Sequence, residues 1–337
     1  MQRSFVTMKD LATAAGVSVM TVSRAFRNDK SVSAKTRKRV LQLADELGYV
    51  FDATAANLRT QRTNFVAVII PSINNANFAD TVGALSDELE KSGMQVLLGY
   101  SDYKSAKEES LIEQLLRRRP DAIVVTGGQH SPRARRLLQS AGIPVVETWD
   151  IPAEPIDHVV GFSNAATMHG MVDYIVGQGM KRIAFIGGDS DDDTRGADRR
   201  RGFIAAMERH NLDASRLISA GPAPISMREG ADAMGRLLDS MPDTQAALCV
   251  SDLSAFGALT ECQRRGVRVP QDLAIAGFGA YEISAVSHPT LTTIDPQPRA
   301  IGKAVADLII ALRENRAALT QPQQIIIDWS LRAASSA

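Results

Sequence analysis

The chain has 337 residues, 45% of them hydrophobic, and its 38 basic residues balance 38 acidic ones. This length exceeds one hydrophobic core, so more than one domain is expected. The five histidines have no metal-ligand spacing, and Cys249 and Cys262 form no Cys-x-x-Cys motif, which argues against metal or redox chemistry. The polar N-terminus and the lack of a membrane-length apolar run predict a cytoplasmic protein with no membrane partner.

Residues 7–26 have the pattern of two short helices joined by a glycine turn. Thr7 can cap the first helix together with Asp10, and apolar residues follow at helical spacing, namely Met8, Leu11, Ala12 and Ala15. Gly16 can adopt the positive φ of a tight turn, and Ser18 can cap the second helix. The pattern predicts a helix-turn-helix that reads DNA, although an ordinary helical hairpin has the same turn.

The second helix would turn Val22 and Phe26 inward and leave a largely polar face outward. The outward residues are Val19, Met20, Thr21, Ser23 and Arg24. A guanidinium suits bidentate contact with guanine in the major groove, and hydroxyls suit contact with phosphates. We therefore expect base reading by Arg24 and phosphate contact by Thr21 or Ser23.

Charge is divided unevenly along the chain. Residues 1–62 carry 11 basic and 5 acidic residues, which leaves 27 basic and 33 acidic residues for the remainder. A compact basic module can neutralise DNA phosphates, whereas an acidic remainder stays off the duplex. A chance asymmetry would give the same count, but the basic part coincides here with the helix-turn-helix pattern.

A third helix is predicted from Ser33, with an apolar face of Val40, Leu43 or Leu41, Ala44 and Leu47, and an end at Gly48 and Tyr49. Residues 52–63 can form a helix but offer little apolar surface, so they would be marginal alone in water. They are either a plain linker or a hinge whose Leu58 inserts between base steps in the minor groove.

Residues 7–63 resemble the headpiece and hinge of the lactose-repressor (LacI) family of transcription regulators. The shared motifs are the Thr-x-x-Asp start, Val-Ser-x-x-Thr-Val-Ser-Arg, Val-Ser-x-x-Thr-Arg, Leu-Gly-Tyr and the hinge leucine. The remainder also fits, so the resemblance covers nearly the whole chain. It implies a sequence-specific regulator of double-stranded operator DNA, controlled by a small effector and acting without a cofactor.

The resemblance assigns roles in DNA binding. Val19, Met20 and Arg24 match base-reading positions. Phosphates would be held by Thr7, Thr21, Ser23, Asn28, Ser33 and Thr36; Tyr49 would close the headpiece, and Ala55 and Leu58 would enter the minor groove. Phe51 and Asp52 depart from the usual Pro and Asn. The apolar pair at 19 and 20 predicts contact with thymine methyls or DNA shape rather than hydrogen bonds.

From residue 64 onward, apolar runs alternate with helical patterns. The runs are 65–70, 95–99, 122–125, 144–146, 158–160, 182–186, 246–250 and 273–276. Uninterrupted apolar strands between amphipathic helices predict parallel sheets covered on both faces. We expect a headpiece over 1–50, a hinge over 51–63 and a body over 64–337. The body would have two α/β lobes, like a periplasmic binding protein, with a break near 161 and the late chain crossing back near 291–296.

Such a body is expected to bind a ligand between its lobes, at the carboxyl ends of the strands. Asn77, Phe78 and Trp149 follow strands there, and the two aromatic rings either stack on a ligand or belong to the core. The charged run 189–203 contains an Arg-x-x-Gly-Phe segment. By resemblance its Arg199 grips the effector, with Arg195 one turn earlier; the alternative is a solvated loop entering a helix.

Two further segments bear on the effector. Ser251 and Asp252 resemble a family segment that bonds effector hydroxyls, although Asp252 could equally cap a helix. Gly279 stands where many relatives carry an effector-binding aspartate, and the loss of a carboxylate near an arginine favours an anion. Residues 147–150 and 155–162 also look like the gluconate-responsive branch of the family. A sugar acid such as gluconate or a keto-gluconate is therefore the expected effector.

The whole pattern predicts a repressor that acts as a homodimer on a pseudo-palindromic operator. Residues 322–329 are expected to form a closing strand, and too few residues follow for a tetramer-forming coiled coil. Two alternatives share the two-lobed body. A periplasmic sugar-binding protein would need an export signal, and an α/β enzyme would need a nucleophile or nucleotide-binding loop, for which the sequence has no motif.

Overall fold

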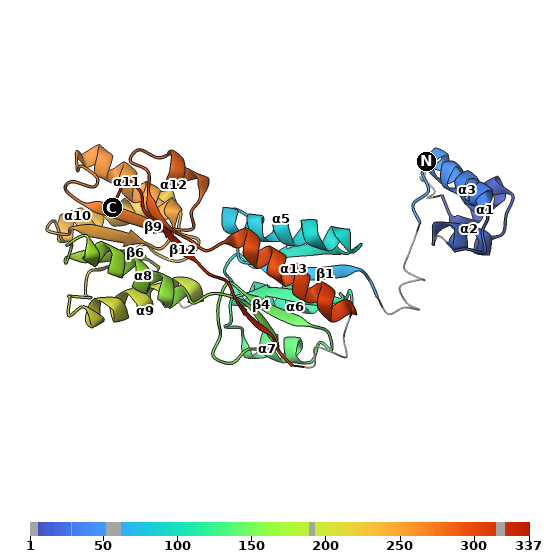
Figure 1. Cartoon of the computed structure of the whole chain (residues 1–337), viewed down its shortest axis with the longest axis horizontal. Coiled ribbons are helices and arrows are strands. Elements are labelled where there is room, and N and C mark those ends of the chain that lie inside the picture. The colour runs from blue at the N-terminus through green and yellow to red at the C-terminus, as the bar shows by residue number, and fades with distance from the viewer. Residues whose placement is uncertain (1–5, 28, 52–61, 189–192, 315–320) are drawn as a thin grey trace. The chain divides into compact units, whose positions relative to one another are not determined.

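Figure 1 shows the computed structural model of the chain, which describes residues 6–27, 29–51, 62–188, 193–314 and 321–337. The chain divides into two compact units, Met1–Thr63 and Asn64–Ala337. Three of the residues predicted to contact DNA, Asn28, Ala55 and Leu58, lie outside the described residues, as does most of the predicted hinge.

The described part of the first unit forms three helices, α1 (Met8–Ala15), α2 (Val19–Phe26) and α3 (Ala34–Leu47). A capping box begins α1, because the Asp10 amide donates to Thr7 Oγ1 (3.3 Å) and the Thr7 amide donates to Asp10 Oδ2 (2.9 Å). Gly16 ends α1 with φ of 63°, as the turn requires. The predicted helix-turn-helix is confirmed, with a core of Leu11, Ala12, Ala15, Val22, Ala25, Val32, Val40 and Ala44.

The second unit is an α/β body whose first sheet has the strand order β11-β5-β4-β3-β1-β2, with all pairings parallel. Its strands are β1 (Phe65–Ile70), β2 (Gln95–Tyr100), β3 (Ala122–Thr126), β4 (Val145–Thr148), β5 (His158–Gly161) and β11 (Gln324–Ile326). Helices α5 (Ala76–Lys91) and α13 (Pro298–Glu314) cover one face, and α6 (Ser105–Leu116) and α7 (Pro132–Gln139) cover the other.

The second sheet has the order β12-β10-β9-β8-β6-β7, and only β12 runs antiparallel within the described ladders. Its strands are β6 (Ile183–Gly187), β7 (Leu217–Ser219), β8 (Ala246–Cys249), β9 (Ala274–Phe278), β10 (Thr292–Asp295) and β12 (Ser330–Arg332). One face packs against α8 (Asn164–Gly177) and α9 (Thr194–Arg209), and the other against α10 (Met227–Ser240) and α11 (Asp252–Arg265).

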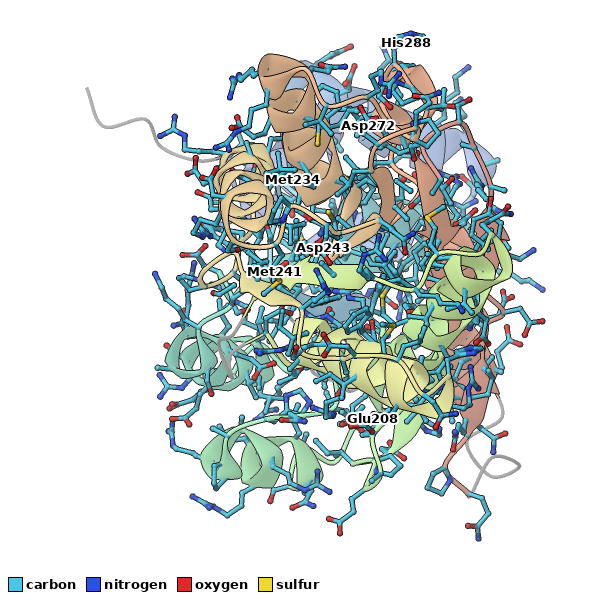
Figure 2. The ribbon with its side chains drawn as sticks, turned by 90° about the vertical axis from the view of Figure 1, so that its left-hand side faces the viewer. Glu208, Met234, Met241, Asp243, Asp272 and His288 are labelled. Carbon is cyan, nitrogen blue, oxygen red and sulfur yellow. The ribbon has the colours of Figure 1, made fainter. Side chains whose placement is uncertain are left out.

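All eight predicted apolar runs are strands, so the expected two-lobed α/β fold is confirmed. Alternate residues of β1 show why these runs are continuous: Val66 and Val68 pack toward α5, whereas Ala67 and Ile69 pack toward α6 and α7. At the amino ends of the strands of the second lobe, Arg216 forms a bidentate ion pair with Asp243 (2.8 and 3.0 Å). Figure 2 shows Asp243 and Asp272 at this end of the lobe.

The chain passes between the lobes three times. It leaves the first lobe after β5, returns between β10 and α13, and crosses again between β11 and β12. The closing strand predicted over 322–329 is present but shorter: Gln324–Ile326 pairs with β5, and a separate strand, Ser330–Arg332, pairs with β10 of the other lobe. One continuous strand would have to stay in one sheet, so the residues between β11 and β12 form the third crossing.

Close contact between α5 and α13, which run side by side in Figure 1, depends on Gly302. A Cβ atom there would lie 2.2 Å from the Thr81 carbonyl oxygen and 3.0 Å from the Leu85 amide nitrogen. We therefore expect Gly302→Ala to lower the free energy of unfolding by roughly 1–3 kcal/mol, because two backbones must separate. The measurement is urea unfolding of the full chain.

Gly83, in the interior of α5, is the matched control. A Cβ atom at Gly83 meets no described atom within 4 Å, so Gly83→Ala should leave stability unchanged or raise it by about 0.5–1 kcal/mol through helix propensity. Equal effects of the two substitutions would contradict the proposed helix contact.

Candidate functional site

A cavity of about 250 Å³ lies between the two lobes, at the carboxyl ends of their strands. Its lining comes from the loops after β1, β2 and β4, and, in the second lobe, from α9, the start of α11 and the end of β9. Six of the eight predicted effector residues line it: Asn77, Phe78, Trp149, Arg195, Arg199 and Ser251. The structure thus brings together residues that lie up to 174 positions apart, which is consistent with a binding site at the ends of parallel strands.

Helix α9 supplies both arginines. Asp193 caps the helix by accepting a hydrogen bond from the Gly196 amide (3.2 Å). Gly202 sets the position of α9 against α8, since a Cβ atom there would lie 2.3 Å from the Ala165 carbonyl oxygen. Close packing of α9 against α8 therefore explains the glycine of the Arg-x-x-Gly-Phe segment. This packing also fixes the direction in which Arg199 points.

The two guanidinium groups are poorly compensated. Arg195 is 6% exposed, with Nη1 3.5 Å from the Thr126 carbonyl oxygen and Nη2 4.0 Å from Asp193 Oδ1. Arg199 lies over the Phe278 ring at 4.2 Å, and its buried Nε has no hydrogen-bond partner among the described residues. Burial lowers the pKa of Arg199, while Asp193 acts in the opposite direction. Arg200 and Arg201 are not among the described lining residues.

Aromatic rings form the apolar wall of the cavity. Phe78 meets Trp149 edge to face, with ring centroids 5.2 Å apart, and Trp149 meets Phe162 in the same way at 5.8 Å. Trp149 has φ of 68°, and its carbonyl oxygen accepts from Asn164 Nδ2 (2.9 Å). These rings line the cavity and belong to the core at the same time, so the two interpretations of Phe78 and Trp149 are compatible.

The other two predicted effector residues lie beside the cavity. Asp252 is fully buried as the first residue of α11, and its carboxylate accepts from Thr293 Oγ1 (2.6 Å) and from the Tyr281 amide (2.8 Å). It does not cap the helix either, because Ser251 is the N-cap. Gly279 lines a neighbouring cavity of about 430 Å³ instead, and Asn77 and Tyr281 line both cavities.

Sequence reasoning missed two tyrosines that line the cavity, Tyr103 of the first lobe and Tyr281 of the second. Burial raises the pKa of each phenol, and in both cases a hydrogen bond with Asn75 partly opposes the rise. Tyr103 follows β2 and Tyr281 follows β9. Their position after parallel strands was the one indication in the sequence that they could line the cavity, because neither tyrosine belongs to a motif.

Behind the cavity, His130 lies between two glutamates. Its Nδ1 is 3.1 Å from Glu108 Oε1 and its Nε2 is 3.6 Å from Glu147 Oε1, and the side chains of His130 and Glu147 are fully buried. Burial lowers the pKa of His130, but the two carboxylates outweigh it and raise the pKa to about 9. This triad joins the loop after β3 to β4 and to α6.

The predicted DNA-reading residues lie on the surface of the first unit. Val19 and Met20 are 45% and 60% exposed, and Arg24 is exposed on the same helix. Thr21 is half-buried, and its hydroxyl lies 2.9 Å from that of Ser18 at the start of α2. Ser33 and Thr36 form the same arrangement at the start of α3, and Thr7 caps α1. Hydroxyls and amides at helix N-termini are groups that bind phosphates.

Tyr49 packs against the core of this unit, and its ring centroid lies 5.8 Å from that of Phe26. The Phe26 ring also stacks on Phe51, with centroids 4.9 Å apart. Phe51, a departure from the usual sequence, thus extends an aromatic cluster at the end of the three helices. None of the described helices is both long and apolar enough to cross a membrane, and the described residues contain no cluster of metal-binding side chains.

Two family models match the chain. The model described as "Bacterial regulatory proteins, lacI family" matches residues 7–52, and the model described as "Periplasmic binding protein-like domain" matches residues 172–335. The first match covers the three-helix unit, and the second covers most of the second lobe together with α13, β11 and β12.

Individual relatives match more than nine-tenths of the chain. It is 33% identical over 306 residues to the HTH-type transcriptional regulator GntR of Pseudomonas aeruginosa, which covers 91% of this chain and 89% of that protein. It is 32% identical over 317 residues to IdnR of Escherichia coli, covering 94% of each. A solved LacI-family transcriptional regulator from Silicibacter pomeroyi has a TM-score of 0.91 at 32% identity, covering 98% of this chain and 99% of that one.

A helix-turn-helix unit joined to a two-lobed body with a cavity between its lobes defines the class of ligand-responsive DNA-binding regulators. The chain belongs to the LacI family of bacterial regulatory proteins and is a DNA-binding transcriptional regulator. Members of this family bind operator DNA and a small effector, and they are regulators rather than enzymes.

The His130 triad predicts a dependence of stability on pH. The folded protein binds the His130 proton more tightly than the unfolded chain, so the contribution is fully present below about pH 6.5 and is lost as the pH rises through about 9. At roughly 1.4 kcal/mol per pKa unit, the loss is on the order of 3 kcal/mol. Urea unfolding of wild type and His130→Gln between pH 6.5 and 9.5 measures it. A difference between the two proteins that stays constant with pH would contradict this assignment.

Proposed function

We propose that the protein is a repressor whose affinity for its operator is controlled by a sugar acid, of the gluconate or keto-gluconate type, bound between the lobes. The observation that carries the proposal is the pair of poorly compensated arginines in the cavity, with a buried and unpartnered Nε on Arg199 among the described residues. A buried cation without a full set of partners favours an anionic ligand that supplies them.

The carboxylates around the cavity support the choice of an anion. Asp193 is used as the cap of α9, and Asp102 forms an ion pair with Lys104 (3.1 Å). Asp252 is engaged in the second lobe, and position 279 carries no carboxylate. A ligand carboxylate on Arg199 and Arg195 thus meets less repulsion than it would beside a free aspartate.

The remaining wall suits the rest of a sugar acid. Phe78 and Trp149 present aromatic surface on which the C–H groups of a sugar pack. Asn77 and Ser251 supply polar side chains for hydroxyls. These six residues are the proposed effector contacts, and Asp252 and Gly279 take part only through the turn beside the cavity.

For DNA binding, we propose that residues 1–50 read the operator and that residues 51–63 act as the hinge. Arg24 would contact guanine, Val19 and Met20 would contact thymine methyls or DNA shape, and the phosphates would be held by Thr7, Thr21, Ser23, Asn28, Ser33 and Thr36. Tyr49 would stabilise the headpiece, and Ala55 and Leu58 would enter the minor groove. A homodimer would present two such headpieces to a pseudo-palindromic site.

Control follows from the position of the cavity. Its walls come from both lobes, so a ligand that contacts both binds one arrangement of the lobes better than another and shifts their populations. The three crossings allow the lobes to move while they stay connected. We propose that this shift changes the ordering of residues 51–63 and thereby the affinity for DNA.

Arg199→Ala tests the effector site. We expect wild type to show a rise in melting temperature with gluconate or a keto-gluconate and a changed affinity for DNA, and Arg199→Ala to lose both while binding DNA as wild type does. Arg201→Ala is the matched control, because Arg201 lies on the same helix, is 64% exposed and pairs with Asp198. Loss of DNA binding together with the response would indicate misfolding, and a response only to a neutral sugar would contradict the sugar-acid proposal.

Arg24→Ala tests base reading. On DNA selected by wild type from a random pool, we expect a loss of about 1–3 kcal/mol in binding free energy and relaxed selectivity at one base pair of each half-site. Thr36→Val, at a proposed phosphate contact, should weaken binding to selected and unrelated DNA alike. If Arg24→Ala left the selected sequence unchanged, another residue would have to read the bases.

A further inference from the structure

The turn between β9 and α12 (Glu282–Val286) has an unusual backbone. Gly279 has φ of 129° and Ala280 has φ of 49°, so two successive residues adopt conformations that side chains disfavour. The Gly279 amide donates to the Ile294 carbonyl oxygen (2.8 Å), and the Ala280 amide donates to Thr293 Oγ1 (3.2 Å). The turn is therefore held by β10 in one shape.

This shape places the Tyr281 ring where a side chain at position 279 would project. A Cβ atom at Gly279 would lie 2.6 and 2.9 Å from Cε1 and Cδ1 of the Tyr281 ring, and 3.0 Å from Asn77 Nδ2. Tyr281 is 8% exposed and lines the cavity between the lobes. A phenol ring thus occupies the space next to the strand end that a carboxylate at position 279 would need.

Asp252 holds the tyrosine in place. One carboxylate oxygen accepts from the Tyr281 amide (2.8 Å), and the other accepts from Thr293 Oγ1 (2.6 Å). Burial raises the pKa of Asp252 to about 6, although these hydrogen bonds and those of the turn act against the rise. The carboxylate is therefore committed to the turn and faces Tyr281 rather than a ligand.

We infer that Tyr281 determines the charge class of the effector: its ring occupies the space that an acidic side chain at position 279 would need, and Asp252 is the residue that positions the ring. This inference rests on the proposed effector function. The cavity then accepts an acid and discriminates against the neutral sugar of the same skeleton, because position 279 adds no second carboxylate to that of Asp193 near Arg199.

The test compares two double variants that differ only in charge. Gly279→Asp/Tyr281→Ala removes the ring and introduces a carboxylate, and Gly279→Asn/Tyr281→Ala has the same shape and backbone strain without the charge. Titration calorimetry on the full chain measures the dissociation constants of gluconate and of glucitol, its neutral counterpart. We expect the preference for gluconate to fall at least tenfold in the aspartate variant, about 1.4 kcal/mol, and less in the asparagine variant.

Two more variants complete the test. Tyr281→Glu and Tyr281→Gln form a second pair that differs only in charge and leaves Gly279 intact, for use if the double variants fail to unfold cooperatively. In Asp252→Asn, the amide oxygen can still accept from Thr293, but an NH₂ group replaces the oxygen that faces the Tyr281 amide. The variant should therefore lower the preference for gluconate, as loss of the ring does. A merely structural role for Asp252 would lower the melting temperature and leave the ratio of the two dissociation constants unchanged.

The outcomes separate the two proposals. A wild type that binds gluconate in preference to glucitol, with equal ratios in the aspartate and asparagine variants, overturns this inference and leaves the proposed function standing. A wild type that binds glucitol at least as well as gluconate overturns both.

Discussion

The binding chemistry of the cavity depends on one buried positive charge, that of Arg199. Arg199 lies against Phe278 with an unpartnered nitrogen among the described residues, and the transfer of such a group from water is costly unless another group compensates it. The fold keeps Arg199 there by holding α9 on both sides of it. Asp193 caps the start of the helix, and Gly202 packs closely against α8. A bound anion would recover part of that cost, which is the driving force of the proposed response to a sugar acid.

Buried acids near the cavity serve the architecture instead of the ligand. Asp252 holds the turn of Tyr281, and Glu147 faces His130. In each network, the removal of one partner would leave the buried acid without compensation. The free energy lost in this way exceeds the net stabilisation that the intact interaction provides. The cavity is thereby framed by rigid polar networks, and the charge offered to a ligand comes mainly from α9.

Sequence alone predicted the strands of the body well, because parallel strands buried on both faces are continuous apolar runs such as Phe65–Ile70. It missed β7 and β10, and it merged β11 with the segment before β12, where three-residue strands have only one half-buried position each and the assignment to a sheet depends on distant partners. In the cavity, the motif residue Arg199 was predictable. Tyr281 was not, since its position follows from the positive φ of Gly279 and Ala280, which no local pattern reveals.

The third crossing has a consequence for biosynthesis. Strand β5, at residues 158–161, finds its last neighbour only in β11, and α5 is covered by a helix that begins at Pro298. On the ribosome, the first lobe must therefore wait with an open sheet edge and an uncovered helix until nearly the entire chain has been made. The described core of the three-helix unit is made of residues 11–44 and can fold at once, so newly made chains acquire the proposed DNA-reading surface long before the proposed effector-binding body.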